Sequence, residues 1–548
     1  MKYITISTIP GMTVPEAYIT DILTRKLCER GISVTKPQAD ALDLQLGVAD
    51  FGVKDGFRIE KLSETSARIV GNDQRGLLYG VGRFLRECSF GDGEFTPCEW
   101  SGFSSPSKPV RGMYFATHFH NYYHDAPIQA INEYVEDLAL WGCSTISVWY
   151  DMHHYTGIDD PAAQGMIAKL KVILKAAKRI GLQPGLTSIA NEGYSTTPDH
   201  LKSVPTQTAH YGVEICPSKQ EGLDLIVKLR QEMLEAFEEV VAEYVWIWPY
   251  DQGGCTCSDC MPWGYNGYLK SGKAEAEVIK KFLPSAKTVV STWCFDYFIE
   301  GEYAGFHNAL ETGELDWADY LMIDAHGEFP PYVIEHGVPG GLPALGFPEI
   351  SMYYMCPWGG WGANPLPNHI QKMWDTSGHL LSGGFPYSEG IFEDLNKAIC
   401  FQLYWDPEKK VSETVKEYAR YELGVDPDIM EQACNLMEAD QHHWKGEESS
   451  LEYHLEHADH AFECLELTQK AAKNIPAWAA KSWRWRILYI RAAIDAALTE
   501  SKGLSTPAVD AMLEELSDIY YADGAEYTVC PLSIRHLKRL YGEITDKQ

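Results

Sequence analysis

Arginine is scarce in the central part of this chain of 548 residues. Between Arg111 and Arg420 only Arg179 and Arg230 occur, and the apolar spacing around both predicts helices. The segments that follow the predicted strands of this region hold almost no lysine either. Because carboxylate and phosphate groups of ligands are usually held by arginine or lysine, we expect no anionic small molecule to be the substrate.

Long apolar runs are also missing. No stretch of about 18 or more apolar residues occurs, so no membrane-spanning helix is expected. The first residues, MKYITISTIPGM, lack the apolar core of a secretory signal, and we expect a cytoplasmic protein. The net charge of −31 makes nucleic acid and anionic membranes poor partners. No glycine-rich dinucleotide fingerprint follows any early predicted strand.

Aromatic residues, in contrast, are plentiful. They make up 12% of the chain, with 16 Trp and 31 Tyr, in an otherwise ordinary globular composition. Large cores account for such an excess, and so do binding sites for ligands with apolar ring faces, such as sugars. The length exceeds what one hydrophobic core supports, so two to four domains are expected.

The predicted elements divide the chain into three parts. Residues 1–108 alternate strands and helices as a small α/β domain, ending in a Ser- and Pro-rich linker at 101–109. Residues 109–407 alternate short apolar strands with helices, which predicts an α/β fold of the (β/α)₈ TIM-barrel type. The pattern of residues 408–548 predicts amphipathic helices. We expect this helical domain to pack on the barrel or to carry a homo-oligomer contact. The eight expected barrel strands are Gly112–Thr117, Thr145–Tyr150, Gln183–Ser188, Tyr244–Pro249, Thr288–Trp293, Tyr320–Ile323, Ala344–Phe347 and Gly383–Pro386.

Two segments resemble known barrel enzymes. GFRI at 56–59 with ARIVGNDQRGLLYGVGRFL at 67–85 is similar to the small domain that precedes the barrel in β-N-acetylhexosaminidases and α-glucuronidases. WPYDQGGCTCSDC at 248–260 resembles a Cys-rich loop of related bacterial barrel proteins. The resemblance implies an exo-acting glycosidase and does not name the sugar.

Acidic residues follow almost every expected barrel strand, where a TIM barrel places its active site. Glycoside hydrolysis needs one carboxylic acid and one carboxylate, and we expect Asp251, Asp324, Glu349 and Glu389 to supply them. The first three match loosely the positions implied by the α-glucuronidase resemblance. The hexosaminidase pattern has an Asp-Glu pair after strand 4; here the pair is Asp251-Gln252, and Gln cannot deliver a proton.

Aromatic and polar residues in the same segments are candidates for holding the substrate. Histidine side chains there suit hydrogen bonds to sugar hydroxyls, although their clustering also leaves a histidine-bound catalytic metal open. The expected substrate-binding residues are His118, Trp149, Asp151, Glu192, Tyr250, Trp293, His326, Trp358 and Tyr387.

Three cysteines lie within six residues after the fourth expected strand. Cys255, Cys257 and Cys260 suit a tetrahedral zinc site, and Cys216 in the preceding loop is the expected fourth ligand. Such a zinc would be structural, because all four positions are filled; no cofactor is expected for catalysis. Reduced core thiols and a disulfide pair are the alternatives.

The sequence therefore favours a glycoside hydrolase that releases a neutral or N-acetylated sugar, an N-acetylhexosaminide above all. An α-glucuronidase-like hydrolase is the alternative, though the scarcity of arginine opposes it. A carbohydrate-binding protein without catalytic activity and a metal-dependent hydrolase are the alternatives of another class. Carbohydrate is the expected partner of both kinds of glycoside hydrolase and of the carbohydrate-binding protein.

Overall fold

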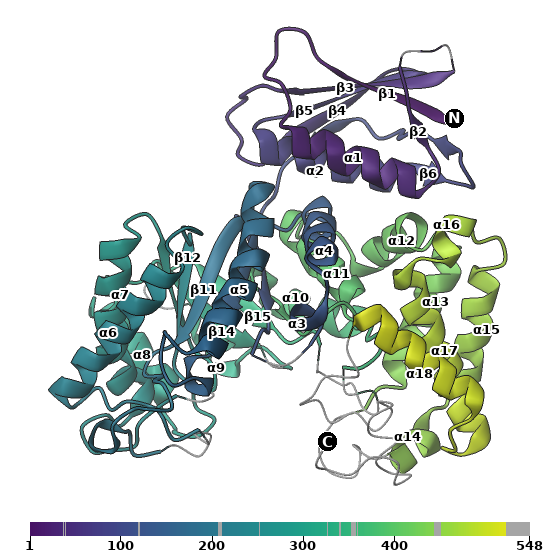
Figure 1. Ribbon diagram of the computed structural model, residues 1–548. Helices are drawn as coiled ribbons and strands as arrows, with labels where there is room; N and C mark the ends of the chain where they lie inside the picture. The colour runs from purple at the N-terminus through teal and green to yellow at the C-terminus, as the bar shows by residue number, and fades with distance from the viewer. Residues whose placement is uncertain are drawn as a thin grey trace.

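The computed structural model describes residues 1–36, 38, 40–118, 121–205, 211–250, 253–325, 327–338, 341–351, 358, 360–442 and 451–521. An α/β sheet, a closed parallel barrel and a group of helices follow one another along the chain, at the top, lower left and lower right of Figure 1. The predicted fold class is confirmed.

The N-terminal sheet has six strands in the order β2-β1-β3-β5-β4-β8. Helices α1 (Ala17–Glu29) and α2 (Gln74–Glu87) lie between this sheet and the rest of the molecule (Figure 1). Gly71 is the last residue of β5, just before α2. A Cβ at this position would lie 2.2 Å from the backbone nitrogen of Leu77, so only glycine fits there. The strands are β1 (Tyr3–Thr8), β2 (Ser33–Val34), β3 (Ala41–Val48), β4 (Phe57–Ser63), β5 (Ser66–Gly71) and β8 (Gly102–Ser104), and β6 (Ser89–Phe90) pairs separately with β7 (Phe95–Thr96).

The segment expected to be only a linker contributes the edge strand β8. Its residues pair antiparallel with β4, Arg58 lying opposite Phe103. The backbone of 102–104 thereby satisfies hydrogen-bonding groups that would otherwise be left at the edge of β4. The Ser- and Pro-rich segment at 101–109 was expected to be only a linker, but its residues 102–104 form a strand.

The barrel closes through β9, which pairs in parallel with both β10 and β16. At the closure Gly383 has a φ of +125°, and a Cβ there would lie 1.7 Å from the carbonyl oxygen of Val110, so only glycine fits. The barrel strands are β9 (Val110–Phe115), β10 (Thr145–Trp149), β11 (Gln183–Ile189), β12 (Tyr244–Trp248), β13 (Lys287–Ser291), β14 (Tyr320–Ala325), β15 (Ala344–Pro348) and β16 (Leu381–Gly384), with a short β17 (Tyr387–Ser388) beside β9.

Helices cover the outside of the barrel. They are α3 (Tyr122–Asp125), α4 (Ile128–Leu140), α5 (Pro161–Arg179), α6 (Gln220–Ala236), α7 (Gly267–Phe282), α8 (Glu302–Glu311), α9 (Pro331–His336), α10 (Pro367–Ser377) and α11 (Asp394–Trp405). Single 3₁₀ turns lie at Met152–His154, Asp199–Leu201, Trp263–Tyr265 and Gly378–Leu380.

Aromatic side chains fill the barrel bore. Trp246 packs edge-on against Phe385 with ring centroids 4.5 Å apart, and Trp248 packs against Phe347 at 4.9 Å. Successive inward positions of a strand stack in layers, so the Trp248 layer lies nearer the carboxyl ends of the strands. This layer forms the floor of the barrel mouth.

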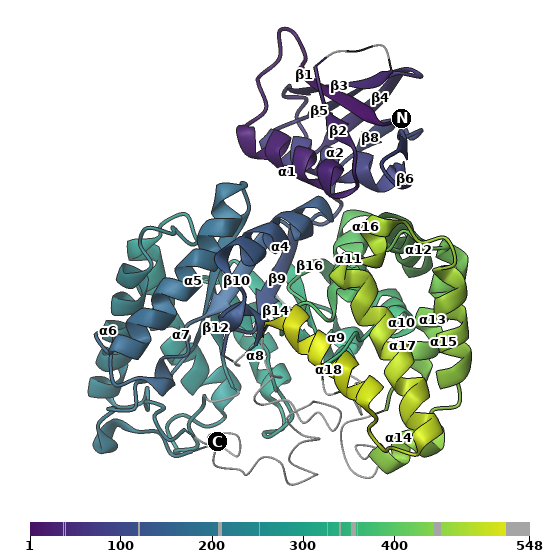
Figure 2. The ribbon, with the colours of Figure 1, turned by 45° about the vertical axis from the view of Figure 1, so that its right-hand side comes forward.

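The C-terminal helices pack beside the barrel, and the last one returns toward it (Figure 2). At the end of that helix, Tyr520 donates a hydrogen bond of 2.7 Å to the backbone oxygen of Glu389. These helices are α12 (Val411–Tyr421), α13 (Pro427–Ala439), α14 (Leu451–His457), α15 (Ala461–Ala471), α16 (Ala477–Ala480), α17 (Trp483–Ser501) and α18 (Pro507–Tyr520). No helix in the described ranges combines the length and the apolar character that a bilayer crossing requires.

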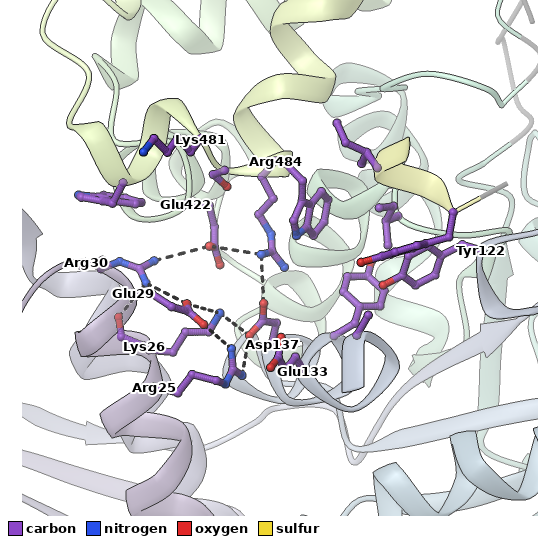
Figure 3. Close-up of a pocket in the computed structure, with 18 residues that line it drawn as sticks. Arg25, Lys26, Glu29, Arg30, Tyr122, Glu133, Asp137, Glu422, Lys481 and Arg484 are labelled. Carbon is purple, nitrogen blue, oxygen red and sulfur yellow. Dashed lines mark hydrogen bonds and ion pairs between the residues drawn. The ribbon is translucent and has the colours of Figure 1, made fainter. Parts of the chain in front are cut away.

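A charged cavity of about 520 Å³ lies where the three parts meet (Figure 3). Asp137 of α4 accepts from Lys26 of α1 at 2.5 Å and from Arg484 of α17 at 3.0 Å, with Arg25 at 3.4 Å. Glu422 lies 3.7 Å from Arg30 in the same cavity. Since these charges pair across the three parts, the cavity is a structural junction, and it shares no described lining residue with the cavity in the barrel mouth.

Candidate active site

A second cavity lies in the mouth of the barrel, over the aromatic floor. Its described lining is mostly aromatic and comes from the ends of seven different strand segments: Tyr114, His118, Trp149, Thr187, Ile189, Trp248, Tyr250, Trp293, Phe347 and Tyr387. No lysine or arginine is among these described residues. The cavity therefore suits a ligand with apolar ring faces and no negative charge.

His118 lies at the centre of this wall. Its Nδ1 is 3.2 Å from the hydroxyl of Tyr114, and its ring centroid is 4.8 Å from that of Trp149. Desolvation in the mouth, assisted by the neighbouring His153, lowers the pKa of His118 to about 3. The imidazole is thus neutral at ordinary pH and can exchange hydrogen bonds with ligand hydroxyls.

One acidic cluster follows β10 and β11. Buried Glu192 accepts hydrogen bonds from the indole of Trp149 at 3.2 Å and from His153 Nδ1 at 2.5 Å. Asp151 is 3% exposed, and burial together with the charge of Glu192 raises its pKa well above the ordinary value. Asp151 and Glu192 therefore lie as neighbouring acids in a buried site.

A second acidic cluster follows β15 and β17. Tyr387 donates to Glu389 Oε1 at 3.0 Å, and Glu349 accepts from the backbone nitrogen of Ser351 at 2.6 Å. Burial, with a smaller contribution from Glu393, raises the pKa of Glu389 to about 8. Glu349 and Tyr387 are also bridge partners through their backbones. This cluster places a protonated carboxyl beside the aromatic wall and a second carboxyl on the adjoining strand.

Asp324 lies between these clusters at the end of β14. Its Oδ2 accepts from the backbone nitrogen of Cys294 at 3.4 Å, just beyond Trp293. Tyr250 lines the cavity, and its hydroxyl donates to Glu302 at 2.7 Å; burial raises the pKa of Glu302 to about 7. Tyr250 thus lines the mouth, and Asp324 contacts the residue that follows Trp293, another residue of the lining.

Two expected residues, Asp251 and His326, lie outside the described residues. Trp358 is described, and its position corrects the expectation of a sugar platform. The ring is fully buried, its indole donates to Asp495 at 2.7 Å, and the Arg491 guanidinium lies 4.8 Å from its centre. Trp358 therefore fastens the loop after β15 to α17 and offers no face to a substrate.

Sequence reasoning overlooked Tyr114, Trp248 and Phe347 because it considered the residues that follow strands. All three lie within strands at inward positions, and their rings meet within 6 Å of one another in the pairs Tyr114–Trp248, Tyr114–Phe347 and Trp248–Phe347. Period-two alternation within β9, β12 and β15 was the signal that could have identified them.

Two groups of described residues have the spacing of metal ligands. Each group's ligand atoms lie within 4.8 Å of one another, and the groups are Cys216, Cys255, Cys257 and Cys260, and Asp151, His153 and His154. In the second group His153 Nδ1 already contacts Glu192. The cysteine group has the chemically stronger donor set, because four thiolates can fill a tetrahedral site.

No protein-family model and no curated protein sequence matches the chain. Solved structures do match it. A family GH138 enzyme targeting pectin rhamnogalacturonan II has a TM-score of 0.59 at 10% identity, covering 99% of this chain and 98% of its own. A family GH115 4-O-methyl-α-glucuronidase has a TM-score of 0.61 at 11% identity, covering 94% and 76%. A β-hexosaminidase of Streptomyces plicatus has 0.52 at 12% identity, covering 77% and 91%. The chain therefore shares the fold of several glycoside hydrolase families.

Proposed function

We propose that this protein is a glycoside hydrolase that releases a neutral or N-acetylated sugar from a chain end. The observation that carries the proposal is that two buried glutamates, Glu389 and Glu349, are joined to Tyr387, which lines the aromatic mouth of the barrel. Glycosidases require one protonated and one ionised carboxyl flanking the bond that breaks. The fold shared with glycoside hydrolases supports the same proposal.

Glu389 is the proposed proton donor. With its pKa raised to about 8 it carries a proton at neutral pH, and one of its oxygens, Oε1, is oriented by the phenol of Tyr387. It would protonate the glycosidic oxygen as the bond from that oxygen to the sugar breaks. Glu349 would then attack the sugar carbon or take a proton from the attacking water.

The sugar is proposed to be uncharged. Arg230 lies near the carboxyl end of β11 and already has partners: its guanidinium donates to the backbone oxygen of Glu192 at 3.2 Å and pairs with buried Glu275 at 3.3 Å. An anionic sugar would thus find no lysine or arginine among the described residues that line the mouth.

A panel of aryl glycosides tests the proposal, comprising neutral hexosides, N-acetylhexosaminides and glucuronides. We expect turnover of a neutral or N-acetylated member and loss of turnover in Glu389→Gln and Glu349→Gln, with sugar binding retained. Glu277→Gln, an exposed acid on the outside of α7, is the matched control. Binding without turnover of any member would favour the non-catalytic carbohydrate-binding alternative, and preferred cleavage of glucuronides would overturn the charge argument.

A metal-dependent hydrolase is the rival mechanism, through Asp151 and His153. A brief treatment with a chelator separates the two, because a carboxylate mechanism needs no exchangeable ion. Unchanged initial rates are expected. Activity that disappears with the chelator and returns with added metal would assign catalysis to the histidine cluster instead.

A further inference from the structure

Four cysteine sulfurs meet at one point between the loops that follow β11 and β12. Cys216 Sγ lies 3.7 Å from that of Cys255 and 3.8 Å from those of Cys257 and Cys260. All four sulfurs lie within 4.8 Å of one another. Cys216, Cys255 and Cys260 are buried, and Cys257 is half-buried.

These distances fit a metal centre and not disulfides. A disulfide needs its sulfurs about 2.05 Å apart. Four thiolates around zinc, with Zn–S bonds of about 2.3 Å, form a tetrahedron whose edges are about 3.8 Å. The three separations from Cys216 equal that edge to within about 0.1 Å. Reduced core thiols have no physical reason to converge on one centre at this spacing, since apolar packing is not directional.

The donor set selects the metal. Four thiolates favour zinc among the common divalent ions, and a filled tetrahedron leaves no position for a substrate or a reactive water. The hydroxyl of Ser218 lies 2.9 Å from Cys216 Sγ and 3.5 Å from Cys257 Sγ, where it can donate to a thiolate and steady its charge.

The same two loops are joined by Asn191, which directly precedes Glu192. Its amide nitrogen donates to the backbone oxygens of Ile215 at 3.0 Å and Gly254 at 2.9 Å, and its oxygen accepts from the nitrogen of Gly254 at 2.9 Å. Ile215 and Gly254 are the residues next to Cys216 and Cys255. The cysteine cluster therefore lies next to the segment that carries Glu192, whose carboxyl accepts from Trp149 in the cavity wall.

We propose that Cys216, Cys255, Cys257 and Cys260 bind one structural zinc ion, which locks the loops after β11 and β12 together behind the barrel mouth. The ion takes no part in bond breaking. It adds a metal link to the hydrogen bonds through which Asn191 and Thr256 already join these loops.

Metal content of the full-length protein tests the proposal. Protein produced with zinc in the medium and purified without chelator should contain about one zinc per chain. Cys257→Ser should lose the ion to a chelator concentration that leaves the parent loaded, and its melting temperature should fall. Cys28→Ser, an exposed cysteine on α1, is the control and should behave as the parent.

Cobalt provides a readout that does not depend on any variant folding. Cobalt added to the metal-depleted parent should give the strong visible bands and thiolate charge-transfer absorption of a tetrahedral tetrathiolate site. Less than about 0.2 metal ions per chain, or a weak cobalt spectrum typical of oxygen ligands, would overturn the proposal. Neither readout involves glycosidase activity, so a failure here leaves the proposed function untouched, and the reverse holds as well.

Discussion

Tyr387 lies in β17, and Glu389 directly follows this strand. The phenol of Tyr387 donates a hydrogen bond of 3.0 Å to the carboxyl of Glu389. The phenol thereby connects the aromatic wall of the barrel mouth to a carboxyl that burial keeps protonated. Substrate held against the wall would lie close to the proposed proton donor. Four expectations follow from this contact and from others described above.

Replacing Glu389 with Gln keeps the size of the side chain and removes its proton. Because general acid catalysis contributes about 10²–10⁴-fold, we expect kcat to fall by that factor while KM changes little. Steady-state kinetics on the preferred aryl glycoside measure the change. An E389Q enzyme with kcat within about threefold of the parent would remove Glu389 from the chemistry.

The alkaline limb of the pH–rate profile should report Glu389. Its protonated form is the active one, so the rate should fall as pH rises through about 8. The Tyr387 hydrogen bond favours the ionised form and lowers the pKa of Glu389. Tyr387→Phe should therefore raise that pKa and move the limb to higher pH. A limb that stays in place or moves to lower pH contradicts the assignment, and a purely structural role for Tyr387 would change the rate without moving the limb.

Trp293 and Trp358 should respond differently to mutation. Trp293 lines the cavity, where an indole can stack on a sugar ring, so Trp293→Ala should raise KM about tenfold with a small effect on stability. Trp358→Phe should leave KM unchanged and lower the melting temperature, because it leaves Asp495 without its indole donor. The inhibition constant of the free sugar and the melting temperature distinguish the Trp293 variant from the Trp358 variant. Equal increases of KM in both variants would contradict the assignment of Trp358 to the core.

Asp137 should stabilise the fold at neutral pH and lose that effect in acid. Burial alone would raise its pKa, but Lys26, Arg484 and Arg25 hold it well below the usual range. A carboxyl with a lowered pKa stabilises the fold above about pH 4, and this contribution is lost as pH falls through the folded-state pKa. Asp137→Asn leaves three cations without their shared partner and should cost about 3–5 kcal/mol of unfolding free energy at pH 7.

Urea denaturation of Asp137→Asn at pH 7 and near pH 3 measures this effect, and the difference from the parent should shrink at the lower pH. The control is Glu60→Gln, which removes an exposed ion pair with Arg68 and should cost about 0–1 kcal/mol. A loss in D137N no larger than in E60Q would show that the junction contributes no more than a surface pair.

The fold was largely predictable because its signals are local. Each expected barrel strand overlaps an observed one, since short apolar runs such as Tyr244–Trp248 are bounded by turns and helices. The environment of a side chain was less predictable where its partner is distant. The sequence suggested that Trp358 is an exposed loop residue. Its indole is buried against α17, where it donates to Asp495, a residue 137 positions further along the chain. Glu389 was identified by its place after a strand, but its raised pKa depends on burial that no local pattern encodes.

The hydrogen bond from Tyr520 to the backbone oxygen of Glu389 connects the helical region to the residue proposed as the proton donor. The barrel supplies the carboxyl, yet a side chain more than a hundred positions later steadies the peptide that carries it. Cutting the protein after α11 would therefore remove this hydrogen bond from the proposed proton donor, so we expect the barrel to depend on the helical region that follows it.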